Sequence, residues 1–139
     1  MLVGTEVFVM KHIIFYTFML FSFCSNALTN NEVVGTWTYS EVGQDYKDTK
    51  ICTFSNNGDL NCLVEEQGIT EHGFGEAHTF KTNGTWSISN DELTLSETIL
   101  DDLLITKFQI ISINSSKLVL ISSNKEQVWQ QSLNAIQAN

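Results

Sequence analysis

Short runs of alternating apolar and polar residues, rich in β-branched and aromatic side chains, recur along the chain and are separated by turn residues. Successive side chains of a strand point to opposite faces, so these runs predict strands with one apolar face. No window carries apolar residues at the spacing of an amphipathic helix. We expect about eight strands, at 33–40, 48–55, 59–66, 77–82, 84–90, 92–98, 104–114 and 117–123, and a further short strand near 127–132.

The connections between these runs are too short for a helical crossover, so neighbouring strands are expected to be antiparallel. A meander of that many strands with one apolar face must close on itself or stack into two layers to protect its edges. The sequence therefore predicts an all-β fold in which an antiparallel up-and-down meander closes into a small barrel. A two-sheet sandwich is the alternative.

The hairpin expected from strands 48–55 and 59–66 predicts a disulfide. Centring this hairpin on Asn57 places Cys52 opposite Cys62 and Phe54 opposite Leu60, all on one face of the sheet. A bridge between the two cysteines would contribute roughly 2–3 kcal/mol by closing a short loop in the unfolded chain. Two free buried thiols are the alternative, and the spacing fits neither a CxxC redox pair nor a zinc site.

Two later hairpins, with turns at Asn90-Asp91 and Ser115-Ser116, also have registers that the alternation defines. Each register brings apolar side chains of the two strands together on one face. In the second of these hairpins both faces are apolar, so we expect it to be central or covered. The expected pairs are Trp86 with Leu95, Ile88 with Leu93, Ile113 with Leu118 and Ile111 with Leu120.

The N-terminal segment has the layout of a secretory signal peptide. Met10, Lys11 and His12 form a basic start, the eleven residues 13–23 are apolar, and small residues precede a cleavage site after Ala27. As a helix, the apolar run would rise only about 16 Å, which is too short to span a bilayer. We expect translation to start at Met10, the signal to end at residue 27, and residues 28–139 to form a single exported domain.

Acylation of Cys24, as in a bacterial lipoprotein, is an alternative interpretation of this segment. Phe23 argues against it, because the lipoprotein peptidase requires a small residue before the cysteine. We expect the exported domain in the periplasm or outside the cell, as a monomer and without stable membrane insertion.

Charge and composition exclude several functions. The chain has 16 acidic residues against seven basic ones, all of them lysine, and a formal net charge of −9. This charge repels phosphate backbones, so no nucleic-acid partner is expected. There is no nucleophile motif and no Gly-rich phosphate loop, and the adjacent carboxylates Glu65-Glu66 and Asp101-Asp102 point to opposite faces of their strands. We expect neither an enzyme nor a bound cofactor.

The densest polar cluster lies between residues 71 and 78, where His72, Glu76 and His78 are of the types that bind zinc. Glycines in and beside this stretch indicate a flexible loop, which positions metal ligands poorly. We interpret the stretch as a solvated loop between two strands and expect no metal. A metal site, or a partner-binding loop with Phe74 as its exposed tip, are the alternatives.

The opening strand, Val33-Val34-Gly35-Thr36-Trp37, follows a signal peptide and carries a G-x-W motif. Together with the later segments 53–59, 84–95 and 110–120, it resembles the small bacterial lipocalin-like domains. The resemblance spans about residues 33–131 and implies a small barrel with an apolar interior. Lipocalins usually pack an arginine across the opening tryptophan. This chain has no arginine, and Lys125 is the expected substitute.

In such a barrel six aromatic residues would point inward and form either a packed core or the wall of a ligand cavity: Trp37, Tyr39, Phe54, Phe80, Trp86 and Phe108. We expect Trp37 to plug the closed end of the barrel. The resemblance implies a non-catalytic binding protein for a small apolar molecule. The alternative is a barrel with a filled core that binds another exported protein, for example as an enzyme inhibitor. Bacterial metallopeptidase inhibitors are also small exported barrels with a disulfide.

Overall fold

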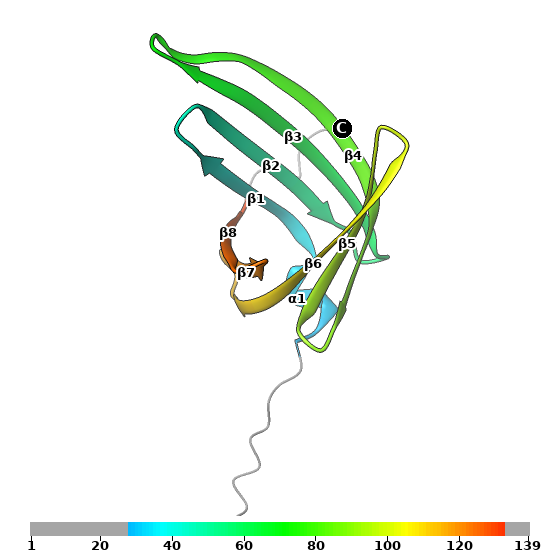
Figure 1. Ribbon diagram of the computed structural model, residues 1–139. Helices are drawn as coiled ribbons and strands as arrows, with labels where there is room; N and C mark the ends of the chain where they lie inside the picture. Colours follow the sequence, from blue (N-terminus) through cyan, green and yellow to red (C-terminus); the bar gives the residue numbers. More distant parts are fainter. Residues whose placement is uncertain (1–27, 133–139) are drawn as a thin grey trace, which may run out of the picture.

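The computed structural model describes residues 28–132. The predicted signal peptide, the start at Met10 and Cys24 lie outside the described residues. A short helix, α1 (Asn30–Val33), is followed by eight antiparallel strands, of which the last returns to pair with the first (Figure 1). This confirms the predicted up-and-down barrel. The strands are β1 (Gly35–Val42), β2 (Tyr46–Phe54), β3 (Asp59–Thr70), β4 (Gly73–Ser89), β5 (Glu92–Ile99), β6 (Asp102–Ile113), β7 (Lys117–Ser122) and β8 (Lys125–Gln131).

A filled core closes the end of the barrel next to α1, which is the lower end in Figure 1. Trp37 is fully buried there, and its indole Nε1 donates a hydrogen bond of 2.8 Å to the carbonyl oxygen of Val33. The tryptophan thus plugs this end, as predicted. Every strand contributes buried apolar side chains to the core, namely Trp37, Cys52, Phe54, Leu60, Cys62, Trp86, Leu93, Leu95, Phe108, Ile110, Leu118, Leu120 and Trp129.

Most of the predicted hairpin registers are confirmed. Cys52 pairs with Cys62 across β2 and β3, and the two form the predicted disulfide. Asn90 and Asp91 both have positive φ, which gives their two-residue turn the twist of the flanking strands. The other pairs found as predicted are Phe54 with Leu60, Trp86 with Leu95, Ile88 with Leu93 and Ile113 with Leu118.

The predicted pairing of Ile111 with Leu120 is wrong. A β-bulge between Ile110 and Ser112 adds one unpaired residue to β6, so Leu120 pairs with Ile110 instead. The extra residue inverts the alternation of faces. Ile110 is therefore buried in the core, whereas Ile111 is 53% exposed.

The predicted boundary between strands 77–82 and 84–90 is also wrong, because both belong to the single strand β4. Gly84 lies inside this strand rather than in a turn, and it permits a close approach to β5. A Cβ at this position would lie 1.8 Å from the carbonyl oxygen of Ser96. The stretch interpreted as a loop is shorter than predicted, since only Glu71 and His72 form the turn before β4 begins. The further strand near 127–132 is the eighth strand, β8.

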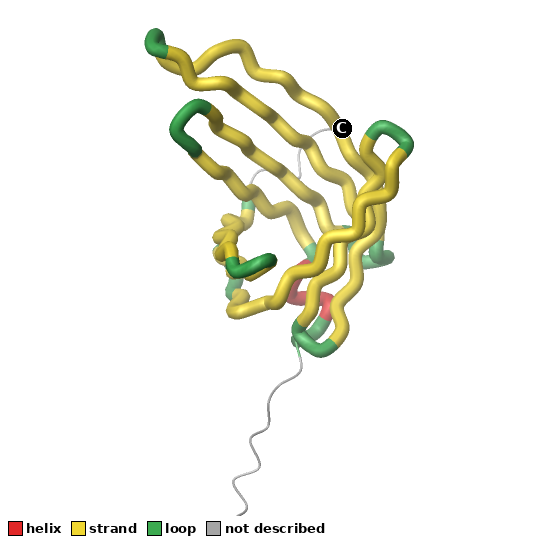
Figure 2. Tube along the Cα trace, viewed as in Figure 1, coloured by secondary structure: helices red, strands yellow, loops and turns green. Residues whose placement is uncertain are grey.

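The upper end of the barrel is uneven because the strands differ in length. The β3–β4 hairpin extends past its neighbours, and β4 pairs with β5 only over residues 83–89 (Figure 2). Backbone pairing between β1 and β8 is limited to Trp37 with Gln131 and Thr38 with Gln130. Above those pairs, side chains join the two strands. No helix within residues 28–132 is both long and apolar enough to cross a membrane.

Candidate ligand-binding site

A cavity of about 190 Å³ lies inside the barrel, above the filled core. Its wall consists of the inward-facing residues of the upper half, because every second residue of a strand faces the interior. Along β2, for example, Phe54 and Cys52 belong to the core, and Lys50 and Asp48 follow on the same face. The lining residues are Tyr39, Glu41, Asp48, Lys50, Val64, Glu66, Leu95, Glu97, Thr106, Phe108, Gln127 and Trp129.

The structure places five of the six aromatic candidates in the cavity wall or in the filled core. Tyr39 and Phe108 line the cavity. Trp37, Phe54 and Trp86 are buried in the core below it, where the rings of Phe54 and Trp86 meet edge to face with centroids 5.6 Å apart. Phe80, the sixth candidate, is half-buried and pairs with the lining residue Val64.

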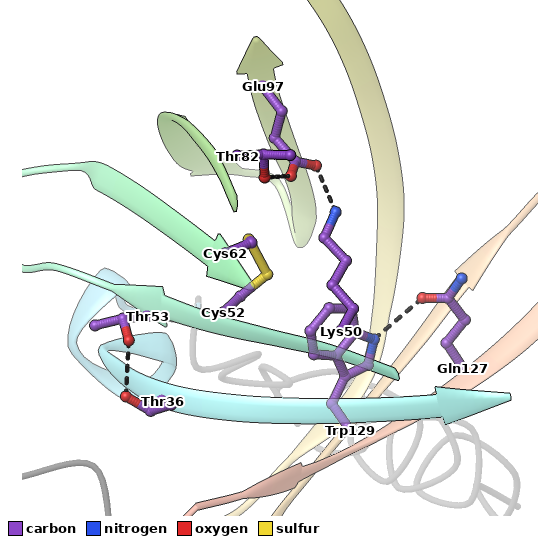
Figure 3. The surroundings of a disulfide bond; sticks show 9 residues. All are labelled: Thr36, Lys50, Cys52, Thr53, Cys62, Thr82, Glu97, Gln127 and Trp129. Carbon is purple, nitrogen blue, oxygen red and sulfur yellow. Dashed lines mark hydrogen bonds and ion pairs between the residues drawn. A yellow bond between two sulfur atoms is a disulfide. The ribbon is translucent and has the colours of Figure 1, made fainter. Parts of the chain in front are cut away.

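A buried ion pair is the main polar feature of the cavity wall. The Nζ of Lys50 lies 2.6 Å from Oε2 of Glu97, and Oγ1 of Thr82 donates a hydrogen bond of 2.7 Å to the other carboxylate oxygen (Figure 3). The Glu97 side chain is only 2% exposed and that of Lys50 is 26% exposed. Because desolvation penalises an isolated carboxylate strongly, Glu97 depends on these two partners.

Carboxylates form a row across the cavity wall. Glu41 of β1 pairs with Asp48 of β2, Asp48 pairs with Glu66 of β3, and Glu66 pairs with His78 of β4. Directly opposite residues share a face, so three acidic side chains lie next to one another. Glu66 is exposed and also lines the cavity, whereas Glu65, which was predicted to point to the opposite face of the strand, does not line it.

Glu41 joins the upper parts of β1, β2 and β8. Its carboxylate accepts hydrogen bonds from Lys125 Nζ at 2.5 Å, from the Tyr46 hydroxyl at 2.9 Å and from the Tyr39 hydroxyl at 3.0 Å. These bonds, that of Lys125 above all, lower the pKa of Glu41 below its ordinary value. The carboxylate in turn raises the pKa of Lys125 and of Tyr46. Lys125 therefore pairs with Glu41 rather than substituting for an arginine over Trp37.

Two aromatic rings add an apolar surface to the wall. Tyr39 and Trp129 stack with centroids 5.5 Å apart and an interplanar angle of 24°. The Trp129 indole Nε1 donates a hydrogen bond of 3.1 Å to the Gln127 side chain, so its polar atom is satisfied (Figure 3). Trp129 is only 2% exposed, and its ring forms part of the apolar base of the cavity.

The metal alternative finds no support in the described part of the chain. His72 lies in the exposed turn, and Glu76 and His78 lie in β4. Among residues 28–132, no group of three or more histidine, cysteine or acidic residues has an arrangement that could hold a metal ion.

Sequence reasoning missed the polar residues of the cavity, Lys50 and Glu97 above all. The sequence did contain a signal. Lys50 lies two and four residues from Cys52 and Phe54, and Glu97 lies two and four residues from Leu95 and Leu93, so each charged residue shares a strand face with apolar residues. Charged residues at the ends of apolar strands are usually solvated, so the alternation alone favoured a surface position. Only closure of the barrel turns these positions into a cavity wall.

A closed eight-stranded antiparallel meander with an apolar plug at one end and a cavity at the other defines a class of small up-and-down β-barrels. Residues 33–120 match the lipocalin-like domain family, and the chain belongs to this family. No curated protein matches the sequence.

Two solved structures from Bacteroides are similar to this chain. A lipocalin-like protein from Bacteroides uniformis shares 13% identity with a TM-score of 0.46, over 73% of this chain and 99% of the other. An uncharacterized protein from Bacteroides eggerthii shares 10% identity with a TM-score of 0.48, over 71% and 98% of the two chains.

Proposed function

We propose that this chain is an exported, non-catalytic protein that binds a small molecule in the upper half of its barrel. The observation that carries the proposal is the cavity of about 190 Å³ above a filled core. Drug-sized ligands occupy pockets of about 300–1,000 Å³, so this cavity suits a smaller molecule. Membership of the lipocalin-like family supports a binding role for the barrel interior.

The wall of the cavity changes in character with depth. Leu95, Phe108 and Trp129 belong to the core and form its base, whereas Glu41, Asp48 and Glu66 lie further toward the rim. The expected ligand therefore has an apolar body, which contacts the base and Val64. We therefore keep the prediction of a small apolar ligand and add that this ligand can carry a polar group near the rim.

A barrel that binds another exported protein remains the alternative. Such a protein would have a filled core like the one in the lower half of this barrel. It would not need the cavity that lies above this core. The two functions differ in whether the native protein takes up a small apolar probe.

Uptake of N-phenyl-1-naphthylamine, a neutral fluorescent probe, tests the proposal. The native protein should bind the probe, and Val64→Phe should weaken this binding at least about fivefold by filling the cavity. Leu63→Phe is the matched control, because Leu63 is the preceding residue of β3 and is exposed on the outer face. An absence of uptake by the native protein, or equal losses in both variants, would contradict the proposal.

Export is supported by the disulfide, since such bonds persist in oxidising compartments. N-terminal sequencing of the protein recovered from the periplasm or medium should begin at Leu28. A mature form that retains residues 13–23 would contradict cleavable export.

A further inference from the structure

We infer that the cavity selects a small organic cation, a primary amine on an apolar or aromatic body. This inference rests on the proposed function, because it names the ligand class of the same cavity. The charges of the wall, the pairing of its lysine with Glu97 and the stacked aromatic pair point to the same chemistry.

The negative charge of the wall is only partly balanced by protein groups. Four carboxylates line the cavity, and two of them have a lysine partner: Glu97 is paired with Lys50 and Glu41 with Lys125. Asp48 and Glu66 take part in no ion pair within the described part of the chain, although they lie directly opposite each other. Like charges in that position destabilise a sheet. An ammonium group between them would remove the repulsion.

An anionic ligand is disfavoured by the same arrangement. Lys50 is the only cationic side chain among the lining residues, and its ammonium group lies 2.6 Å from the buried Glu97 carboxylate. To bind an anion, Lys50 would have to leave Glu97 without a charged partner in the barrel interior, which is strongly unfavourable. The net charge of −9 also attracts cations to the open end.

The aromatic pair provides a surface for the rest of the ligand. Trp129 and Tyr39 are stacked at the cavity wall, with the row of carboxylates on the rim side of Tyr39 along β1. An apolar body can contact this pair at the base of the cavity, mainly through the half-buried Tyr39 ring because Trp129 is only 2% exposed, while its ammonium group reaches the carboxylates. A cation within about 6 Å of such a ring gains a further attraction.

Three compounds that differ only in the head group test the inference: 4-phenylbutylamine, 4-phenylbutan-1-ol and 4-phenylbutyrate. Their affinities are measured by isothermal titration calorimetry with the disulfide-bonded mature protein, near pH 7 and at about 150 mM salt, where distant surface charges are screened. The amine should bind at least about tenfold more tightly than the alcohol, and the carboxylate should bind most weakly.

Two conservative variants test whether the carboxylates of Asp48 and Glu66 cause the preference for the amine. Asp48→Asn and Glu66→Gln should each weaken binding of the amine about three- to tenfold and leave binding of the alcohol unchanged. Glu65→Gln is the matched control, because it removes the same charge from the adjacent residue, which faces outward. Neither cavity variant should lower the Tm, since each removes a like-charge contact.

The outcomes separate this inference from the proposed function. Equal affinity for the amine and the alcohol would overturn the inference and leave the proposed function in place, as would uptake of the neutral probe without any binding of the amine. Equal losses in Glu66→Gln and Glu65→Gln would also overturn it, because the effect would then come from net charge. Failure of all three compounds and of the neutral probe would overturn the proposed function itself.

Discussion

Glu97 lies at a position where a charged side chain is tolerated only because two other strands supply its partners. Lys50 comes from β2 and Thr82 from β4, and the ion pair joins residues 47 positions apart in the chain. Burial of this pair is weak evidence for stability in itself, because desolvation offsets much of the attraction. Loss of one partner should nevertheless be costly.

Lys50→Met should therefore destabilise the barrel by about 2–4 kcal/mol, because it leaves the Glu97 carboxylate buried without a countercharge. The double variant Lys50→Met with Glu97→Met should recover most of this loss, since an apolar pair of similar size replaces the ion pair. Urea unfolding of the single and double variants measures both effects. A single variant as stable as the native protein would show that Glu97 has access to water.

At the scale of single elements, β4 depends on the close approach that Gly84 permits. A Cβ at this position would overlap the Ser96 carbonyl oxygen, so Gly84→Ala should cost about 1–3 kcal/mol and displace β4 from β5. Gly68→Ala is the control, because a Cβ there has no atom within 4 Å. Thermal unfolding of the two variants should give a lowered Tm for the first alone. Equal Tm values would mean that the two strands separate without cost.

The seam between β1 and β8 should be sensitive to acid. The pKa of Glu41 is lowered by Lys125 and by the tyrosines, so the stabilisation from its ionised form is complete above the ordinary value of 4.5. This stabilisation is lost as the pH falls through the lowered pKa of the folded protein. Glu41→Gln should therefore lower the Tm near pH 7 by a few degrees at most, because Lys125 is largely exposed.

Comparison of the native protein with Glu41→Gln across the pH range provides the measurement for this seam. The difference in Tm should shrink as the pH falls below 4.5. A difference that is as large in strong acid as at neutral pH would show that the ionised carboxylate is not what joins the strands.

At the scale of the whole molecule, the strands and the disulfide could be predicted because hairpin registers depend on turns only a few residues away. Cys52 and Cys62 are ten positions apart, and the turn between them determines their pairing. The bulge next to Ile111 has no glycine or proline to indicate it, so its register was predicted wrongly. The strand break predicted at residue 83 is wrong, and the close contact that explains the adjacent Gly84 comes from another strand.

The candidate site was less predictable because its wall comes from strands that meet only when the barrel closes. The aromatic candidates were chosen by alternation, which gives the face of a side chain but not its height in the barrel. Trp37 and Phe54 therefore proved to be core residues, Tyr39 a cavity residue, and Phe108 a core residue that also lines the cavity. Trp129, in the strand predicted least clearly, completes the cavity wall.

The three tryptophans provide the most direct test of ligand binding in the upper half. All three belong to the core, and Trp129 also lines the cavity, whereas Trp37 and Trp86 do not. We expect 19F NMR of protein labelled with 5-fluorotryptophan to show three resonances, assigned by substituting each tryptophan with phenylalanine. Saturation with whichever phenylbutyl compound binds most tightly should shift the Trp129 resonance and leave the other two nearly unchanged. An unchanged Trp129 resonance, or a larger shift of Trp37 or Trp86, would contradict a binding site in the upper half of the barrel.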